Sequence, residues 1–166
     1  MRSAWVVVCL LAAGIASRPW SPTQLKENQK MEHQKNAVRF IKSEALPPSP
    51  GYSQAADVRP GRMIYVAGQV SMDRSGKLVG EGDMRAQAQQ TFENLKAALE
   101  ASGAKFENVV KLNYYVLDVS QLPAVREVRD KFVNTANPPA STAVEVKRLF
   151  REGFLIEVEA VAATPE

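Results

Sequence analysis

Cysteine and histidine are almost absent from this chain, whose 166 residues include one of each, Cys9 and His33. A zinc site built from cysteine and histidine ligands therefore cannot be assembled. A serine–histidine–aspartate triad would have to use His33, which lies in a polar segment near the N-terminus and is more simply interpreted as a solvated side chain. These absences remove the commonest catalytic and metal-binding side chains from consideration.

Glycine motifs that hold nucleotides are also missing. Gly80 and Gly82 begin a dinucleotide-binding fingerprint, but its third glycine position is occupied by Arg85. The sequence contains no calcium-loop spacing and no HExxH pair of metal ligands. We therefore expect the protein to use no cofactor and to bind no metal. Only Glu157 and Glu159 share one face of a predicted strand, and their simplest interpretation is a solvent-facing sheet edge.

A surplus of positive charge is lacking in most of the chain. Residues 51–166 hold 14 Lys and Arg against 15 Asp and Glu, whereas residues 17–50 hold six against three. A nucleic-acid-binding domain normally presents a basic face. We therefore expect no nucleic-acid partner.

The N-terminal residues have the three parts of a secretory signal peptide. Arg2 supplies the positive start, residues 4–13 are uninterruptedly apolar, and the small residues Gly14 and Ala16 precede a cleavage position. The apolar run is too short to span a bilayer. We interpret residues 1–16 as a signal peptide, with a buried N-terminal helix as the alternative. A periplasmic or secreted protein, with no membrane association once the signal is removed, is therefore expected.

The rest of the chain divides into a leader and one domain. Residues 17–36 are polar and have little apolar surface to bury, which predicts a flexible leader or a short surface helix. Residues 37–166 are long enough for a single folded domain. The chain is 45% hydrophobic and 23% charged, which is ordinary for a globular protein.

Hydrophobic periodicity predicts two helices in this domain. Asp83 is placed to cap a helix whose apolar residues recur at helical spacing until Gly103, a suitable end. Ser120 is placed to cap a second helix, with Pro123 in its first turn and Asn137 at its end.

Strands are predicted over residues 37–42, 62–71, 108–117, 141–149 and 154–162. A tight turn at residues 151–153 is expected to join the last two. Gly68 lies inside the second strand, where a glycine indicates a bulge or the close approach of a ligand to the backbone. The order ββαβαββ predicts an α+β fold, a single mixed sheet with two helices on one face. The other face then needs a partner, so self-association is expected.

Four short motifs lie far apart in the sequence. They are GYSQA at 51–55, VAGQ at 66–69, PASTAVEV at 139–146 and IEVEA at 156–160. In this order and at these separations they resemble the RidA/YjgF family of reactive-intermediate deaminases, and the resemblance runs from about Val38 to the C-terminus. It implies a chorismate-mutase-like fold and a homotrimer whose bare sheet faces turn inward. It also implies pockets for a small-molecule ligand in the clefts between neighbouring subunits.

The resemblance further implies an activity and the residues that perform it. Deaminases of this family hydrolyse short-lived enamines and imines to a carbonyl product and ammonia, without a cofactor. By motif position, Glu157 is the catalytic residue that positions the attacking water, and Tyr52 and Gly68 are substrate-binding residues. Where the deaminases carry an arginine whose fork binds the substrate carboxylate, this chain carries Ser141, the fourth expected site residue.

The serine leaves two functions open. One is an imine deaminase with altered substrate preference, and the other is a family member that binds a small molecule without turning it over. Arg126 or Arg129 from a neighbouring subunit could supply the missing charge. The substitution Ser141→Arg is expected to raise activity on carboxylate-bearing imines, and no effect would mean that the pocket has been remodelled elsewhere.

Ribonuclease activity and translation inhibition, which older family names imply, are disfavoured because the domain is nearly neutral and lacks a histidine.

Overall fold

A computed structural model describes residues 21–25, 38–59 and 61–165. The chain divides into two units, residues 1–33 and residues 34–166. The expected signal peptide and most of the expected leader, including His33, lie outside the described residues. Within the first unit the structure describes one helical turn at 22–25. In the described part of the chain, none of the helices has the length and apolar character needed to cross a membrane.

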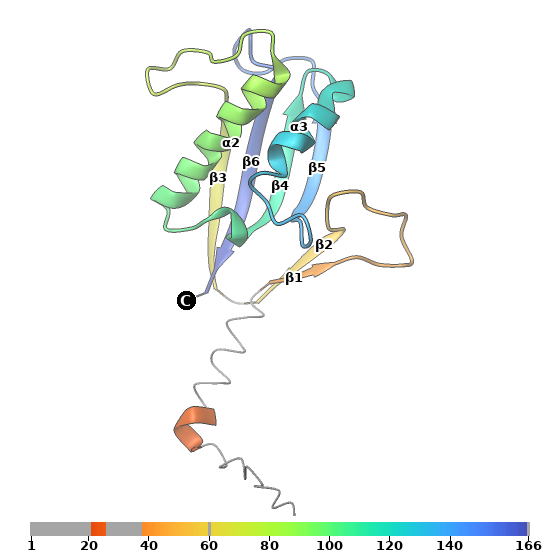
Figure 1. Ribbon diagram of the computed structural model, residues 1–166, viewed down its shortest axis with the longest axis vertical. Coiled ribbons are helices and arrows are strands. Elements are labelled where there is room, and N and C mark those ends of the chain that lie inside the picture. The colour runs from red at the N-terminus through yellow and green to blue at the C-terminus, as the bar shows by residue number, and fades with distance from the viewer. Residues whose placement is uncertain (1–20, 26–37, 60, 166) are drawn as a thin grey trace, which may run out of the picture. The chain divides into compact units, whose positions relative to one another are not determined.

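The second unit is built on a four-stranded sheet with the order β3–β6–β4–β5 (Figure 1). Its strands are β3 (Arg62–Val70), β4 (Val109–Val116), β5 (Ala140–Glu145) and β6 (Ile156–Thr164). Strand β6 is antiparallel to both of its neighbours, whereas β4 and β5 are parallel to each other. Helices α2 (Met84–Ala101) and α3 (Leu122–Arg129) lie on one face of the sheet (Figure 1). The predicted α+β fold, with a mixed sheet and two helices on one face, is confirmed.

A short strand that the periodicity does not reveal precedes this sheet. Strand β2 (Ala55–Val58) pairs antiparallel with β1 (Val38–Ile41) in a separate two-stranded sheet, so the first predicted strand does not join the main one. Ser53 ties this hairpin to the start of β5, because its Oγ donates to the carbonyl oxygen of Pro138 at 2.7 Å and its backbone N to that of Pro139 at 3.2 Å.

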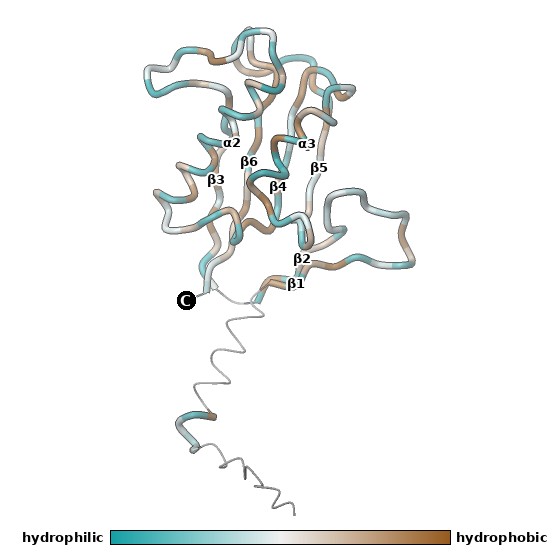
Figure 2. The backbone as a smooth tube through the Cα atoms, viewed as in Figure 1, coloured by the Kyte–Doolittle hydropathy of each residue, from teal (hydrophilic) through white to brown (hydrophobic). Residues whose placement is uncertain are grey.

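Helix α2 forms as the sequence predicts. Asp83 Oδ1 accepts hydrogen bonds from the backbone N–H groups of Arg85 and Ala86, at 2.9 and 3.1 Å. Gly103 follows the helix in the left-handed conformation, with φ +73°. Figure 2 shows hydrophilic and hydrophobic residues alternating along α2. Its apolar stripe is fully buried against the sheet and comprises Ala88, Phe92, Leu95 and Leu99.

Helix α3 is shorter than predicted, and its N-cap is Gln121, which makes no side-chain capping hydrogen bond. Asp118, not Ser120, caps the 3₁₀ turn Val119–Gln121 that leads into the helix, because its Oδ1 accepts from the Ser120 backbone N at 2.9 Å. The α-helix continues from this turn and ends at Arg129, well before Asn137. A second 3₁₀ turn, Phe106–Asn108, leads into β4.

The last two strands are not neighbours, so the predicted tight connection between them is wrong. Strand β5 ends at Glu145 and lies at the edge of the sheet beside β4. Residues 146–155 then cross to β6, which lies in the middle of the sheet between β3 and β4. Glu157 on β6 is therefore not on an edge strand, and the simplest interpretation of that carboxylate from sequence is also wrong.

Alternation along β4 assigns side chains to the two faces of the sheet. Val110, Leu112, Tyr114 and Val116 are buried, and the residues between them are half-buried on the opposite side. We call that opposite side the uncovered face, since neither helix lies over it. Tyr65 of β3 is 78% exposed, and Met63 and Val144 are further exposed apolar side chains.

Candidate functional site

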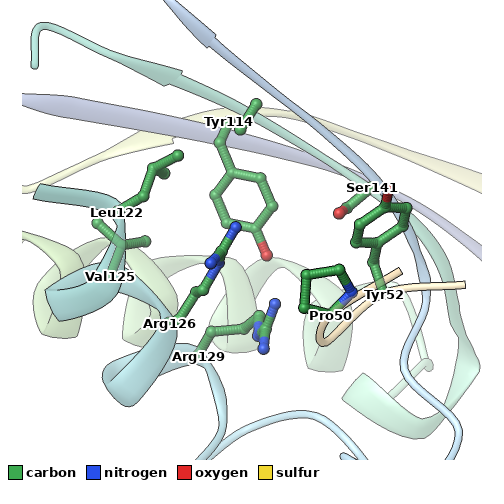
Figure 3. A pocket seen from close by; sticks show the side chains of 9 residues that line it. Pro50, Tyr52, Tyr114, Leu122, Val125, Arg126, Arg129 and Ser141 are labelled. Atoms are coloured by element: carbon green, nitrogen blue, oxygen red, sulfur yellow. The ribbon is translucent and has the colours of Figure 1, made fainter. Parts of the chain in front are cut away.

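The four residues expected to form the site fall into two pairs on opposite faces of the sheet. Tyr52 and Ser141 line one cavity on the helix-covered side (Figure 3). Gly68 and Glu157 lie against each other on the uncovered face. Within one copy of the chain, the sheet therefore separates the two pairs.

The cavity beside Ser141 is small, with a volume of about 30 Å³. A cavity of that volume has room for about two water molecules. It lies between the loop before β2, helix α3 and strands β4 and β5, which contribute Pro50, Tyr52, Arg126, Arg129, Tyr114 and Ser141. Ser141 is half-buried and faces this opening, not a packed interior.

Two guanidinium groups of the same subunit line this cavity, whereas the sequence analysis considers them only as contributions from a neighbour. Arg129 is 7% exposed, and its Nε and Nη2 both donate to Asp130 Oδ1, at 2.8 and 2.6 Å. Arg126 is exposed and forms no ion pair with any residue that the structure describes. The positive charge that position 141 lacks is therefore present on the opposite wall of the same cavity.

Gly51 allows the loop before β2 to approach Arg129 closely. Its φ is +74°, in the left-handed region, and a Cβ placed on it would lie 2.9 Å from Arg129 Nη2. Because glycine has no Cβ, it can adopt this backbone conformation and leaves room for the guanidinium group. The loop that carries Pro50 and Tyr52 consequently packs over the guanidinium group.

Tyr114 of β4 adds a buried hydroxyl group to the cavity. The residue is 5% exposed, and its hydroxyl donates a hydrogen bond to no described residue. Burial raises the pKa of the phenol, and the charge of the nearby Arg129 and a hydrogen bond from its guanidinium group oppose part of that shift. The hydroxyl is therefore protonated at neutral pH and available as a donor. A buried polar group without a partner costs about 1–3 kcal/mol, so this position favours a bound polar molecule.

The uncovered face carries two carboxylates in different surroundings. Glu159 Oε1 accepts hydrogen bonds from Asn113 Nδ2 and Tyr115 OH, each at 2.8 Å. Partial burial, and then the negative charge of Glu159, raise the pKa of Glu157, to which no described residue donates a hydrogen bond. A carboxyl group with a raised pKa is better suited to accept and return a proton near neutral pH. In the part of the chain that the structure describes, no three His, Cys, Asp or Glu side chains gather to hold a metal ion.

Gly68 provides the space in which the Glu157 carboxylate lies. It occupies a bulge where the register of β3 against β6 shifts between Val66 and Gln69, as a glycine inside this strand predicts. A Cβ on Gly68 would overlap Oε1 of Glu157. The bulge thus places the carboxylate directly against the backbone of β3.

Comparisons with known proteins agree with this architecture. A family model described as Endoribonuclease L-PSP matches residues 42–164. Protein DfrA of Myxococcus xanthus is 37% identical over 129 residues, which are 77% of this chain and 97% of that protein. A 2-iminobutanoate/2-iminopropanoate deaminase of Salmonella typhimurium is 37% identical over 127 residues, which are 75% of this chain and 96% of the deaminase. The crystal structure of the Rid family protein YyfB from Yersinia pestis matches 76% of this chain and 98% of its own, with 37% identity and a TM-score of 0.72.

Proposed function

Because the chain belongs to the RidA/YjgF family, whose model is described as Endoribonuclease L-PSP, we propose that it hydrolyses small enamine or imine metabolites to a carbonyl product and ammonia. Several relatives are named 2-iminobutanoate/2-iminopropanoate deaminase, which supports this reaction class. The main support for this proposal is the environment of the Glu157 carboxylate. Its carboxylate has a raised pKa, receives no hydrogen bond from a described residue and lies against Gly68.

The proposal includes a homotrimer, because the sheet separates the two pairs of site residues within one copy. If the uncovered face of one subunit meets the cavity of the next, Glu157 and Gly68 of one copy join Tyr52 and Ser141 of its neighbour in one cleft. The exposed apolar side chains of the uncovered face support such burial. The ligand is then held by two subunits.

The reaction requires one proton acceptor near the attacking water. As water attacks the imine carbon, Glu157 accepts a proton from it, the new C–O bond forms, and the electron pair of the C=N bond moves to nitrogen, to which Glu157 returns the proton. The hydroxyl proton of the carbinolamine is then transferred to nitrogen, the C–N bond breaks to release ammonia, and the C=O bond forms. One imine and one water give one carbonyl compound and one ammonia. An enamine enters the same sequence after protonation at carbon.

Ser141 alters the substrate preference in this proposal. Its hydroxyl offers a single uncharged donor, whereas an arginine at the same position would offer two parallel bonds to a carboxylate. Tyr52 lies beside it in the lining of the cavity and limits the space that is left for the ligand. Substrates of the arginine-bearing deaminases are therefore expected to bind differently here.

The alternative function is binding of a small molecule without turnover. One observation favours it: position 141 has no arginine to hold a substrate carboxylate. In that case Glu157 would hold the ligand through a hydrogen bond and would not transfer a proton.

Release of keto acid by the purified protein distinguishes the two functions. 2-Iminobutanoate or 2-aminoacrylate is generated enzymatically in the assay, and we expect its hydrolysis to accelerate in proportion to protein concentration. A rate equal to the spontaneous one at high protein concentration would overturn the hydrolase. A rise in melting temperature with added 2-oxobutanoate would then support the binding function, because a ligand of the native state stabilises it by mass action.

We also propose that the protein is periplasmic or secreted, on the strength of the sequence of residues 1–16. Mass spectrometry of the protein recovered after expression with its complete N-terminus tests this. We expect a mature chain that begins within two residues of Ser17, and retention of Met1 or Arg2 would contradict export through a cleaved signal.

A further inference from the structure

The cavity beside Ser141 is lined by positive charge that the described ion pairs do not fully neutralise. Arg129 donates to Asp130 through Nε and Nη2, and no described carboxylate accepts a hydrogen bond from its Nη1. Arg126 lines the same cavity and is not neutralised there by a described carboxylate. Glu127, the acidic residue next to it on α3, is paired with Arg85 at 2.5 Å. The cavity wall formed by α3 is therefore net positive.

The hydroxyl of Tyr114, which donates to no described residue, also favours a ligand at this place. It lies on the sheet wall of the cavity, is almost completely buried, and is directed towards the space beside the two arginines (Figure 3). A donor of this kind and two guanidinium groups match the acceptors of a carboxylate, which can receive several hydrogen bonds at once.

We propose that Arg126 and Arg129 of α3, with the Tyr114 hydroxyl, bind the carboxylate of the substrate and replace the arginine that position 141 lacks. The ligand class is a small 2-imino acid or the corresponding 2-keto acid. The inference rests on the proposed function for the identity of that ligand. The cavity has room for about two water molecules, so it receives the carboxylate group alone and the remainder of the substrate extends out of it.

This arrangement explains why a serine occupies position 141. A third guanidinium group in a cavity of about 30 Å³ would fill the space that the ligand needs and would repel the two already present. Ser141→Arg is therefore expected to weaken the binding of carboxylates. That result is the opposite of the gain expected if the cavity contained no other cation.

Both arginines also have a purely structural interpretation. They lie in the last turn of α3, where positive charge interacts favourably with the helix dipole, and Arg129 pairs with its neighbour Asp130. Neither of these roles requires a ligand. The test therefore has to measure binding, in variants that leave the fold intact.

Calorimetric titration of the purified oligomer with 2-oxobutanoate provides that measurement, with the neutral butanone as the matched probe. Arg126 is exposed, so Arg126→Gln should fold normally, and Tyr114→Phe keeps the buried ring. We expect Arg126→Gln to weaken 2-oxobutanoate binding about ten- to a hundredfold and Tyr114→Phe about tenfold. The control Arg74→Gln changes an exposed arginine in the loop after β3 and should leave the affinity unchanged. Butanone should not bind.

Each outcome decides the inference. The inference would be overturned if Arg126→Gln and Tyr114→Phe bound 2-oxobutanoate as tightly as the unaltered protein. Tighter binding of 2-oxobutanoate by Ser141→Arg would also overturn it. So would a lack of binding of 2-oxobutanoate to the unaltered protein at millimolar concentration. Arginine-dependent binding without imine hydrolysis would support the inference while removing the proposed activity. Imine hydrolysis with an unchanged KM in Arg126→Gln would retain the activity and overturn the inference.

Discussion

The cavity beside Ser141 and the uncovered face of the sheet offer opposite chemistry to a ligand. The cavity is lined by a loop, a helix and two strands, and it presents two guanidinium groups and a buried hydroxyl. The uncovered face is open and presents two carboxylates, of which Glu157 has the raised pKa. The first region can hold an anion and the second can move a proton. Because the sheet lies between them, one ligand reaches both regions only in the proposed contact between two subunits.

Breaking the contact between subunits should have the largest effect. Tyr65→Glu places a carboxylate on the uncovered face, where its burial against another subunit would be unfavourable. We expect a folded monomer in analytical ultracentrifugation and hydrolysis no faster than the spontaneous rate. The control Tyr65→Phe should remain a trimer. A Tyr65→Glu monomer with full activity would show that a single copy contains the whole site.

Removing the proton acceptor should have the next largest effect. Glu157→Gln preserves the size of the side chain but cannot accept the proton of water, so kcat should fall by about 10²–10⁴. Glu152→Gln, in the exposed connection between β5 and β6, is the matched control and should retain full activity. The rate is measured as keto-acid release, and an unchanged kcat in Glu157→Gln would exclude this residue as the base.

Displacing the same carboxylate without removing it should have a smaller effect. A Cβ at position 68 overlaps only the flexible end of Glu157, so in Gly68→Ala the carboxylate moves while the backbone stays in place. We expect kcat to fall by up to about 10², with little change in melting temperature. Unchanged kcat in a folded Gly68→Ala protein would contradict the positioning of Glu157 by the bulge.

The folded chain could be predicted best where the signals are local. The cap at Asp83, the stop at Gly103 and the alternation along residues 109–116 each specify an element without reference to the rest of the molecule. The pairing of β5 with β4 depends on tertiary contacts, and periodicity does not identify a partner strand. Asp118 and Ser120 are both favourable caps two residues apart, so the sequence alone could not choose between them.

The candidate site was predictable only in part. The family motifs identify Tyr52 and Ser141, which line one cavity. The role proposed for Arg126 and Arg129 depends on how α3 packs on the sheet, which charge pattern does not specify. Tyr114 did carry a signal: a tyrosine among aliphatic residues on a buried strand face brings a hydroxyl that needs a partner.

The smallest expected effect concerns pH. Glu157 must be deprotonated to accept a proton, so kcat/KM should rise with pH through its pKa. The charge of Glu159 contributes to the raised pKa, second to burial, and Glu159→Gln should therefore lower it and move the acidic limb of the profile to lower pH. The pH dependence of kcat/KM measures this shift. If the acidic limb of the kcat/KM profile stayed at the same pH in Glu159→Gln, a group other than Glu157 would determine it.

Mixing two inactive variants tests the divided site most directly. Tyr52→Ala impairs the cavity and Glu157→Gln impairs the uncovered face, and each alone should form an inactive or nearly inactive trimer. If the two regions come from different subunits, co-expressed mixed trimers contain intact sites, and random mixing should restore about a quarter of the unaltered activity. If instead each copy supplies its own complete site, every site in a mixed trimer is defective. Activity no greater than that of the two variants measured separately would contradict the account.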